Sequence, residues 1–147
     1  MKITIVLMLF VMAGSGHVRA QRHEAVSTTD APKAIGPYSQ AVVAGDLVFV
    51  SGQLGIDPKT DKFVEGGIRE QTDRVLKNIK AVLESAHCGL DDVVSCSVFL
   101  KDMNDFAAMN EVYARHFPEN PPSRATVQVT RLPKDGLIEI SCIAAMK

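Results

Sequence analysis

The sequence predicts an α+β domain in which two helices pack on one face of a mixed β-sheet. The candidate elements run in the order strand, strand, helix, strand, helix, strand, strand. The candidate strands show the two-residue alternation of half-buried strands, whereas the candidate helices repeat their apolar residues every three or four positions. Amphipathic helices in such an order bury their apolar stripes against one face of the sheet.

A β-hairpin and a long helix open this order. Residues 40–44 and 47–53 are predicted strands, and Gly45-Asp46 between them is a hairpin turn signal. Residues 57–60, which include Pro58, predict a further turn. Residues 68–86 are the first predicted helix, because their apolar residues fall at helical spacing and Gly89 stops the pattern.

A strand and a second helix follow. Residues 93–100 predict a strand, and residues 102–117 predict a helix that Pro118 ends. The apolar face expected for the strand comprises Val94, Cys96, Val98 and Leu100. The buried stripe expected for the helix comprises Phe106, Met109, Val112, Tyr113 and Phe117.

The last two predicted strands carry the candidate chemistry. Alternation around Val127 predicts one strand, and the isoleucines that flank Glu139 predict the other. Residues 132–136 contain Pro133 and an Asp-Gly step, so we expect the strands to pair as a hairpin that carries Arg124 and Glu139 on one unit. A guanidinium that binds a carboxylate, beside a carboxylate that positions water, suits hydrolysis of a small anionic substrate. A structural ion pair between the two is the alternative.

Five motifs occur in register along the chain, and they carry a family resemblance. They are IGPYSQ at residues 35–40, SGQ at 51–53, DMNDF at 102–106, PSR at 122–124, and LPK with IEI between 132 and 140. From about Thr29 to the C-terminus the sequence resembles the RidA/YjgF reactive-intermediate deaminases. The resemblance implies a chorismate-mutase-like fold and a homotrimer with active sites between subunits.

The resemblance also implies a set of site residues. Arg124 matches the arginine that clamps the substrate carboxylate with a planar fork, which lysine cannot reproduce. Glu139 matches the glutamate that orients the attacking water. The other substrate-binding positions that it implies are Tyr38, Ser51, Asn110 and Thr126.

Three of these residues could have a purely structural role, and two positions of the sequence differ from the usual family residue. Tyr38 can be a loop aromatic that covers the core, Ser51 can bond to nearby backbone, and Asn110 can face solvent. Thr126 stands where several of the deaminases have cysteine, and the family uses mainly the backbone there. Ser141 replaces a residue that is often acidic in the family.

The function that the resemblance implies is hydrolysis of 2-imino acids or their enamine tautomers. 2-Iminopropanoate and 2-iminobutanoate would give 2-keto acids and ammonia without a cofactor or a metal. A non-catalytic binder of 2-keto acids is the alternative, but a carboxylate such as Glu139 beside a bound anion does not help a mere binder, since like charges repel. A nuclease or translation inhibitor is disfavoured because the chain has no basic stripe for nucleic acid, whereas the sequence does not exclude a chaperone-like activity.

The N-terminus predicts export. Residues 1–20 are predicted to be a cleaved signal peptide, because Lys2 precedes an apolar run over residues 3–13 and small residues flank a cleavage position before Gln21. The run is shorter than the ~20 residues of a membrane-spanning helix, so an uncleaved anchor is the alternative. Residues 21–30 are expected to be a flexible segment and residues 31–147 the RidA/YjgF-like domain. We therefore expect a periplasmic or secreted protein without stable membrane insertion.

The mature chain would be mildly acidic and contain an odd number of cysteines. Cleavage would leave 14 of the 16 basic residues and all 17 acidic residues, a formal charge of −3. The three cysteines are Cys88, Cys96 and Cys142. Cys96 and Cys142 fall in apolar strand patterns, which favours buried free thiols, although the redox state of all three is open.

Overall fold

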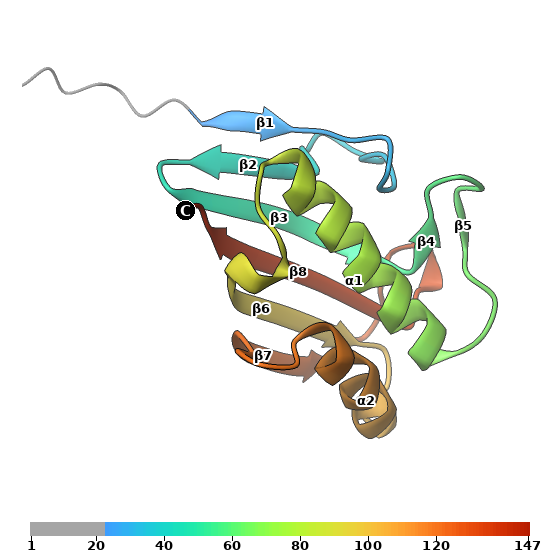
Figure 1. The fold of residues 1–147 in the computed structure, drawn as a ribbon. Helices are drawn as coiled ribbons and strands as arrows, with labels where there is room; N and C mark the ends of the chain where they lie inside the picture. Colours follow the sequence, from blue (N-terminus) through green and yellow to red (C-terminus); the bar gives the residue numbers. More distant parts are fainter. Residues whose placement is uncertain (1–22) are drawn as a thin grey trace, which may run out of the picture.

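Six strands form the main sheet of the computed structural model, which describes residues 23–147 (Figure 1). Across the sheet their order is β1 (Glu24–Val26), β2 (Ala41–Ala44), β3 (Leu47–Leu54), β8 (Ile138–Ala145), β6 (Val93–Leu100) and β7 (Ser123–Gln128). Only β6 and β7 are parallel, so the sheet is mixed, as the sequence predicts. The predicted signal peptide lies outside the described residues.

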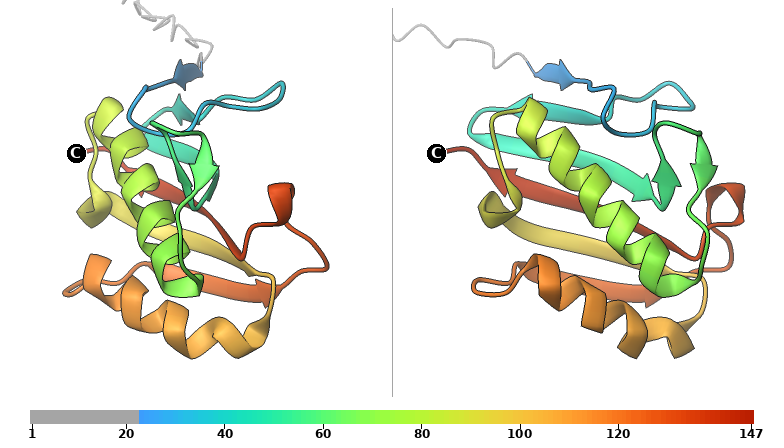
Figure 2. Two further views of the ribbon diagram at one scale, coloured as in Figure 1. Left: turned by 90° about the vertical axis from the view of Figure 1, so that its right-hand side faces the viewer. Right: turned by 45° about the vertical axis from the view of Figure 1, so that its right-hand side comes forward.

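Both helices cover the same face of the sheet. Helix α1 (Ile68–Ser85) crosses the central strands, and α2 (Phe106–His116) lies over β6 and β7, which the turned views also show (Figure 2). The expected helix over residues 102–117 begins as a 3-10 turn, η2 (Met103–Asp105), before α2. The predicted two-helix layer is thus confirmed, and the opposite face carries no helix among residues 23–147. Below we call that uncovered side the open face.

Short elements complete the chain. Strands β4 (Ile56–Asp57) and β5 (Lys62–Phe63) form a separate small hairpin around the predicted turn. Two further 3-10 turns are η1 (Leu90–Asp92) before β6 and η3 (Pro133–Asp135) before β8. The predicted turn at Gly45-Asp46 joins β2 to β3, and Gly45 there has a φ of 61°, a conformation that favours glycine.

Strand β8 is the centre of the sheet and separates its two faces. Its residues Ile138, Ile140, Cys142 and Ala144 are buried under the helices, whereas the residues between them point to the open face. Its partners are β3 on one side and β6 on the other. Alternate side chains of β8 therefore contribute to the buried core and to the open face.

Polar side chains of α1 fix the chain around β8. The Asn78 amide donates to the carbonyls of Leu54 (3.0 Å) and Ile56 (2.9 Å), where β3 leads into β4. The Gln71 side-chain oxygen accepts from the Leu137 N–H (3.0 Å), next to the first residue of β8. Because both amides are buried, these bonds hold the ends of β3 and β8 in a fixed position beneath α1.

The cysteines are free and buried, as predicted for Cys96 and Cys142. These two face each other across β6 and β8 on the helix-covered side of the sheet. Burial raises the pKa of both thiols, which keeps them protonated and weakly reactive. Cys88 is also buried, and desolvation raises the pKa of its thiol.

Three expectations differ from the structure. Strands β7 and β8 do not form a hairpin, because β6 lies between them and pairs with both. Within the segment 21–30, expected to be flexible, Glu24–Val26 forms β1 and pairs with β2 through backbone hydrogen bonds that do not depend on side-chain type. On β6, Val93 is buried and Val94 is exposed, because a register irregularity between Val93 and Ser95 interrupts the alternation.

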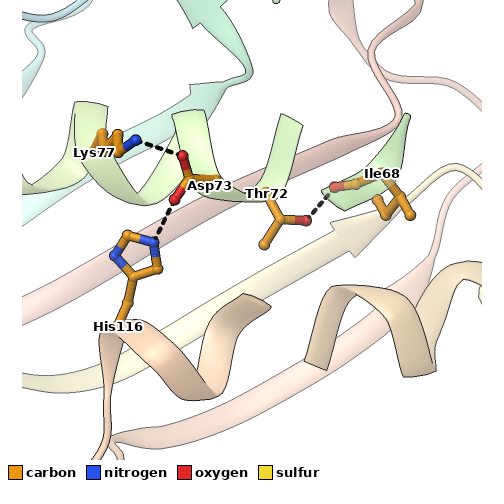
Figure 3. Close-up of polar contacts among 5 residues, drawn as sticks. All are labelled: Ile68, Thr72, Asp73, Lys77 and His116. Atoms are coloured by element: carbon orange, nitrogen blue, oxygen red, sulfur yellow. Dashed lines mark hydrogen bonds and ion pairs between the residues drawn. The ribbon is translucent and has the colours of Figure 1, made fainter. Parts of the chain in front are cut away.

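A polar clasp joins the two helices on their solvent side (Figure 3). Asp73 of α1 accepts hydrogen bonds from Lys77 on the same helix (2.6 Å) and from the ring of His116 at the end of α2 (2.9 Å). Partial burial opposes ionisation of Asp73, but these two partners outweigh it and lower the pKa of the carboxyl. The ionised form of Asp73 therefore stabilises the contact between α1 and α2.

The clasp predicts a pH-dependent stability difference between the wild type and Asp73→Asn. A carboxyl with a lowered folded-state pKa stabilises the fold above its unfolded-state pKa, about 3.9, and loses this contribution as pH falls through the folded-state pKa. We expect Asp73→Asn to cost at most about 1 kcal/mol at pH 7, since the pair is partly exposed. The cost should shrink progressively as the pH falls below the unfolded-state pKa and through the lowered folded-state pKa of Asp73.

Urea unfolding between pH 7 and pH 2.5 measures this difference. Glu65→Gln is the matched control, because Glu65 is exposed and has no ion-pair partner among residues 23–147. A cost for Asp73→Asn that stays constant across this range would contradict a role for the ionised carboxylate.

Candidate active site

Glu139 occupies the open face, at the start of β8. Its side chain is half-buried, and within the described part of the chain it has no hydrogen bond or ion pair. Desolvation raises the pKa of its carboxyl above the ordinary value, because no nearby cation offsets the burial. A carboxyl of this kind can exchange protons closer to neutral pH than an exposed glutamate can.

Gly52 of β3 makes room for that carboxylate. A Cβ atom built on Gly52 would lie 2.0 Å from the Glu139 Oε1 atom and 2.7 Å from its carboxyl carbon. No side chain at position 52 fits while Glu139 keeps this conformation. Gly52 therefore lets the carboxylate lie directly on the backbone of β3.

Tyr38 and Ser51 line the same cavity as Glu139. This hollow of about 360 Å³ is also lined by Ile35, Gly52, Leu54 and Pro133. The Ser51 hydroxyl donates to the Ser39 carbonyl (2.7 Å), which ties the loop before β2 to β3 and leaves the oxygen of the hydroxyl free to accept. Tyr38 is half-exposed on that loop, and its hydroxyl accepts from the Ile35 N–H (3.3 Å).

Arg124 lies on the helix-covered face, at the start of β7. It pairs in register with the buried Cys96 of β6, and its guanidinium lies against aromatic rings of α2. Among residues 23–147 it has no hydrogen-bond acceptor and no carboxylate partner. The five N–H donors of this half-buried cation are thus available to an anion.

A second cavity, of about 410 Å³, lies in front of Arg124. Asn110 of α2 lines it together with Tyr113, Ala114, Phe117, Pro121 and Pro122. Asn110 therefore faces the cavity of Arg124 and is only partly exposed. Thr126, two residues after Arg124 on the same face, has a buried hydroxyl without a hydrogen-bond partner in the described part of the chain.

The predicted site residues thus form two groups on opposite faces of one sheet. Arg124, Asn110 and Thr126 belong to the helix-covered face, and Tyr38, Ser51 and Glu139 to the open face. The expectation that one hairpin carries Arg124 beside Glu139 is wrong, because β6 separates their strands and the side chains alternate. The alternative of an ion pair between Arg124 and Glu139 is excluded within one chain for the same reason.

We find neither a metal-binding cluster nor a membrane-spanning helix among the described residues. Residues 23–147 contain no group of three or more His, Cys, Asp or Glu side chains placed to hold a metal ion. Within the same range, neither helix is long and apolar enough to cross a bilayer.

Comparisons with known proteins decide the family. A family model described as Endoribonuclease L-PSP matches residues 28–146. The chain is 59% identical over 121 residues to a RutC family protein of Pyrococcus horikoshii, covering 82% of this chain and 96% of the relative. It is 46% identical over 125 residues to the chloroplastic Reactive Intermediate Deaminase A of Arabidopsis thaliana, covering 85% and 67%. The chain belongs to the RidA family.

A solved structure supports the RidA fold independently of sequence motifs. The structure of E. coli TdcF with bound serine superposes with a TM-score of 0.81 at 40% identity, covering 84% of this chain and 99% of TdcF. The expected RidA fold is thereby confirmed. The family includes proteins named reactive intermediate deaminases, and other relatives carry the names endoribonuclease or translation initiation inhibitor.

Sequence reasoning missed three residues of this RidA-family site. Gly52 was part of a motif, but only the structure shows that the carboxylate of Glu139 lies against it. Tyr113 and Phe106 were assigned to the buried stripe of α2, whereas their rings contact the guanidinium of Arg124. The available signal was their seven-residue spacing, which places both rings on one side of a helix.

Gly52→Ala tests the close packing of Glu139 on β3. The added methyl group should displace the carboxylate toward solvent, so the raised pKa of Glu139 should fall toward its ordinary value of about 4.3. A carbon-detected NMR titration of the Glu139 carboxyl measures this pKa. Gly67→Ala is the control, because a Cβ there meets no atom closer than 4.0 Å. An unchanged Glu139 pKa in Gly52→Ala would refute the packing argument.

Proposed function

We propose that this RidA-family protein hydrolyses 2-imino acids, or their enamine tautomers, to 2-keto acids and ammonia. One observation carries the proposal: a half-buried arginine and a half-buried glutamate both line cavities, and neither has an ion-pair partner among residues 23–147. Structural ion pairs account for most partly buried charges, so unpaired ones are candidates for ligand binding and catalysis. 2-Iminopropanoate and 2-iminobutanoate are the proposed substrates.

Assembly would bring the two groups of site residues together. Arg124 and Glu139 lie on opposite faces of one sheet, so they can flank one substrate only if they come from different subunits. The open face offers a surface for such assembly, because Phe49 and Val127 are 41% and 47% exposed there. We propose a homotrimer with intersubunit sites, as the resemblance to RidA implies.

The proposed reaction uses Arg124 and Glu139 in separate roles. Arg124 would bind the substrate carboxylate with two parallel hydrogen bonds and so fix the position of the imine carbon. Glu139 would take a proton from a water molecule as its oxygen adds to that carbon. Starting from the protonated imine, this addition gives a carbinolamine, to whose nitrogen Glu139 would return the proton. Ammonia would then leave as the C–N bond breaks, and Glu139 would accept the remaining hydroxyl proton as the keto group forms.

The other site residues would complete the pocket. Tyr38 would cover its mouth, and the Ser51 hydroxyl and the Asn110 amide would bind polar atoms of the substrate. Backbone groups near Thr126 would help to hold the water. These roles need no cofactor, since a protonated imine is already electrophilic.

Two alternatives remain tied to specific observations. A binder of small carboxylates would use Arg124 in the same way, and the relative TdcF has been crystallised with serine. A nuclease is suggested by the family description, but the chain carries a net charge of −1 and has no basic run to follow a phosphate backbone. The raised pKa of Glu139 favours the hydrolase, because a binder does not need a proton-accepting group beside the anion.

A subunit-mixing experiment tests both the reaction and the shared site. We expect wild type to release ammonia and keto acid from freshly generated 2-iminopropanoate and 2-iminobutanoate above the spontaneous rate. Arg124→Ala and Glu139→Gln should each lower kcat/KM by about 100-fold. Trimers reassembled from equal amounts of the two variants should regain about a quarter of wild-type activity, since random mixing joins one intact Arg124 to one intact Glu139 at that frequency.

Each outcome of this experiment has a distinct meaning. No regain would show that Arg124 and Glu139 do not form one site across two subunits. No turnover by wild type that still binds 2-oxobutanoate would leave the carboxylate binder. The control is each variant reassembled with itself, which should stay inactive.

We also propose that the protein is exported. The support is the signal-like pattern of residues 1–20, which lie outside the described structure. The mature N-terminus, sequenced from protein made in its native cell, should begin near Gln21. A mature protein that still begins at Met1 would instead support the membrane anchor or a retained leader.

A further inference from the structure

Two aromatic rings of α2 hold the guanidinium of Arg124. Its central carbon lies 4.5 Å from the centroid of the Tyr113 ring and 5.7 Å from that of Phe106. Both distances are within the range of cation–π attraction. No carboxylate among residues 23–147 pairs with Arg124, so these rings, and not an anion, fix its position.

The kind of contact matters for a residue that must bind an anion. A carboxylate partner would occupy the N–H groups of Arg124 and compete with the substrate. Aromatic rings attract the guanidinium through its positive charge and do not occupy its N–H groups as a carboxylate partner would. An aromatic support therefore restricts a flexible side chain and leaves its hydrogen-bond donors free.

The Tyr113 ring is itself held in place. It is 5% exposed and packs against Phe117, with ring centroids 4.7 Å apart and planes tilted by 36°. Its hydroxyl is buried, lies near the Cys96 thiol and makes no hydrogen bond to Arg124 in the described part of the chain. The ring, and not the hydroxyl, is thus the part of Tyr113 that acts on Arg124.

We propose that Tyr113, assisted by Phe106, is a positioning residue that orients Arg124 for binding the substrate carboxylate. The role rests on the proposed function of Arg124. Phe106 is 38% exposed and more distant, so it contributes less than Tyr113. This role accounts for the seven-residue spacing of Phe106 and Tyr113, which places both rings on the side of α2 that faces Arg124 of β7.

Substitutions that separate the ring from the hydroxyl test the proposal. Tyr113→Leu removes the ring face and should weaken binding of 2-oxobutanoate by about tenfold, measured by calorimetry. It should raise KM more than it lowers kcat. Tyr113→Phe keeps the ring and should bind within about twofold of wild type. Phe106→Leu, which alters a partly exposed residue, should weaken binding by about threefold.

A second readout does not depend on substrate. The ring current of Tyr113 should shift the NMR signal of the Arg124 Nε–H group, and this shift should persist in Tyr113→Phe and collapse in Tyr113→Leu. Circular dichroism confirms that each variant is folded, and Phe106→Leu carries the test if Tyr113→Leu is not.

The two readouts distinguish failure of the inference from failure of the proposed function. Equal loss of binding in Tyr113→Phe and Tyr113→Leu would assign the effect to the hydroxyl and overturn the proposal. An Arg124 signal that is unchanged in Tyr113→Leu would also overturn it. A wild type that binds no keto acid, but whose Arg124 signal responds as expected, would reject the proposed ligand and retain the aromatic support of Arg124.

Discussion

The central position of β8 is the constraint on which the rest of the structure depends. Because β3 and β6 pair with its two edges, its alternate side chains must face either the helix layer or the open face. Ile138 and Ile140 thereby enter the core, and Glu139 between them faces outward. The same alternation, carried across β6 to β7, puts Arg124 under α2. The alternation of side chains along the strands thus places the two charged residues of the candidate site on opposite faces of the sheet.

The sequence predicts local structure well because local structure follows periodicity. The limits of β6 agree with the prediction at both ends, and α1 differs only at its last residue. Strand pairing was harder to predict from the sequence, since the residue types at 132–136 are those of a hairpin turn. Its strands are separated by β6, which reaches β7 through the α2 crossover, and no local signal encodes that choice.

The site shows a similar division. Motifs identify Arg124 and Glu139, because their residue types and context are local properties. The faces on which they lie depend on sheet order, and the closeness of Gly52 to Glu139 depends on the pairing of β3 with β8. Neither is a property of one segment. Only the folded structure shows that a surface charge such as Arg69 has an ion-pair partner, Glu111, whereas Arg124 and Glu139 have none within the described part of the chain.

The separation of Arg124 from Glu139 across the sheet has a consequence for the proposed activity. If each site takes one residue from each of two chains, a dissociated subunit has no complete site, and the fraction of active protein follows mass action. Specific activity would then fall on dilution, and substitutions on the open face far from the substrate would act as loss-of-function changes. If the protein is exported into a large volume, as proposed, its local concentration would set the fraction of active sites.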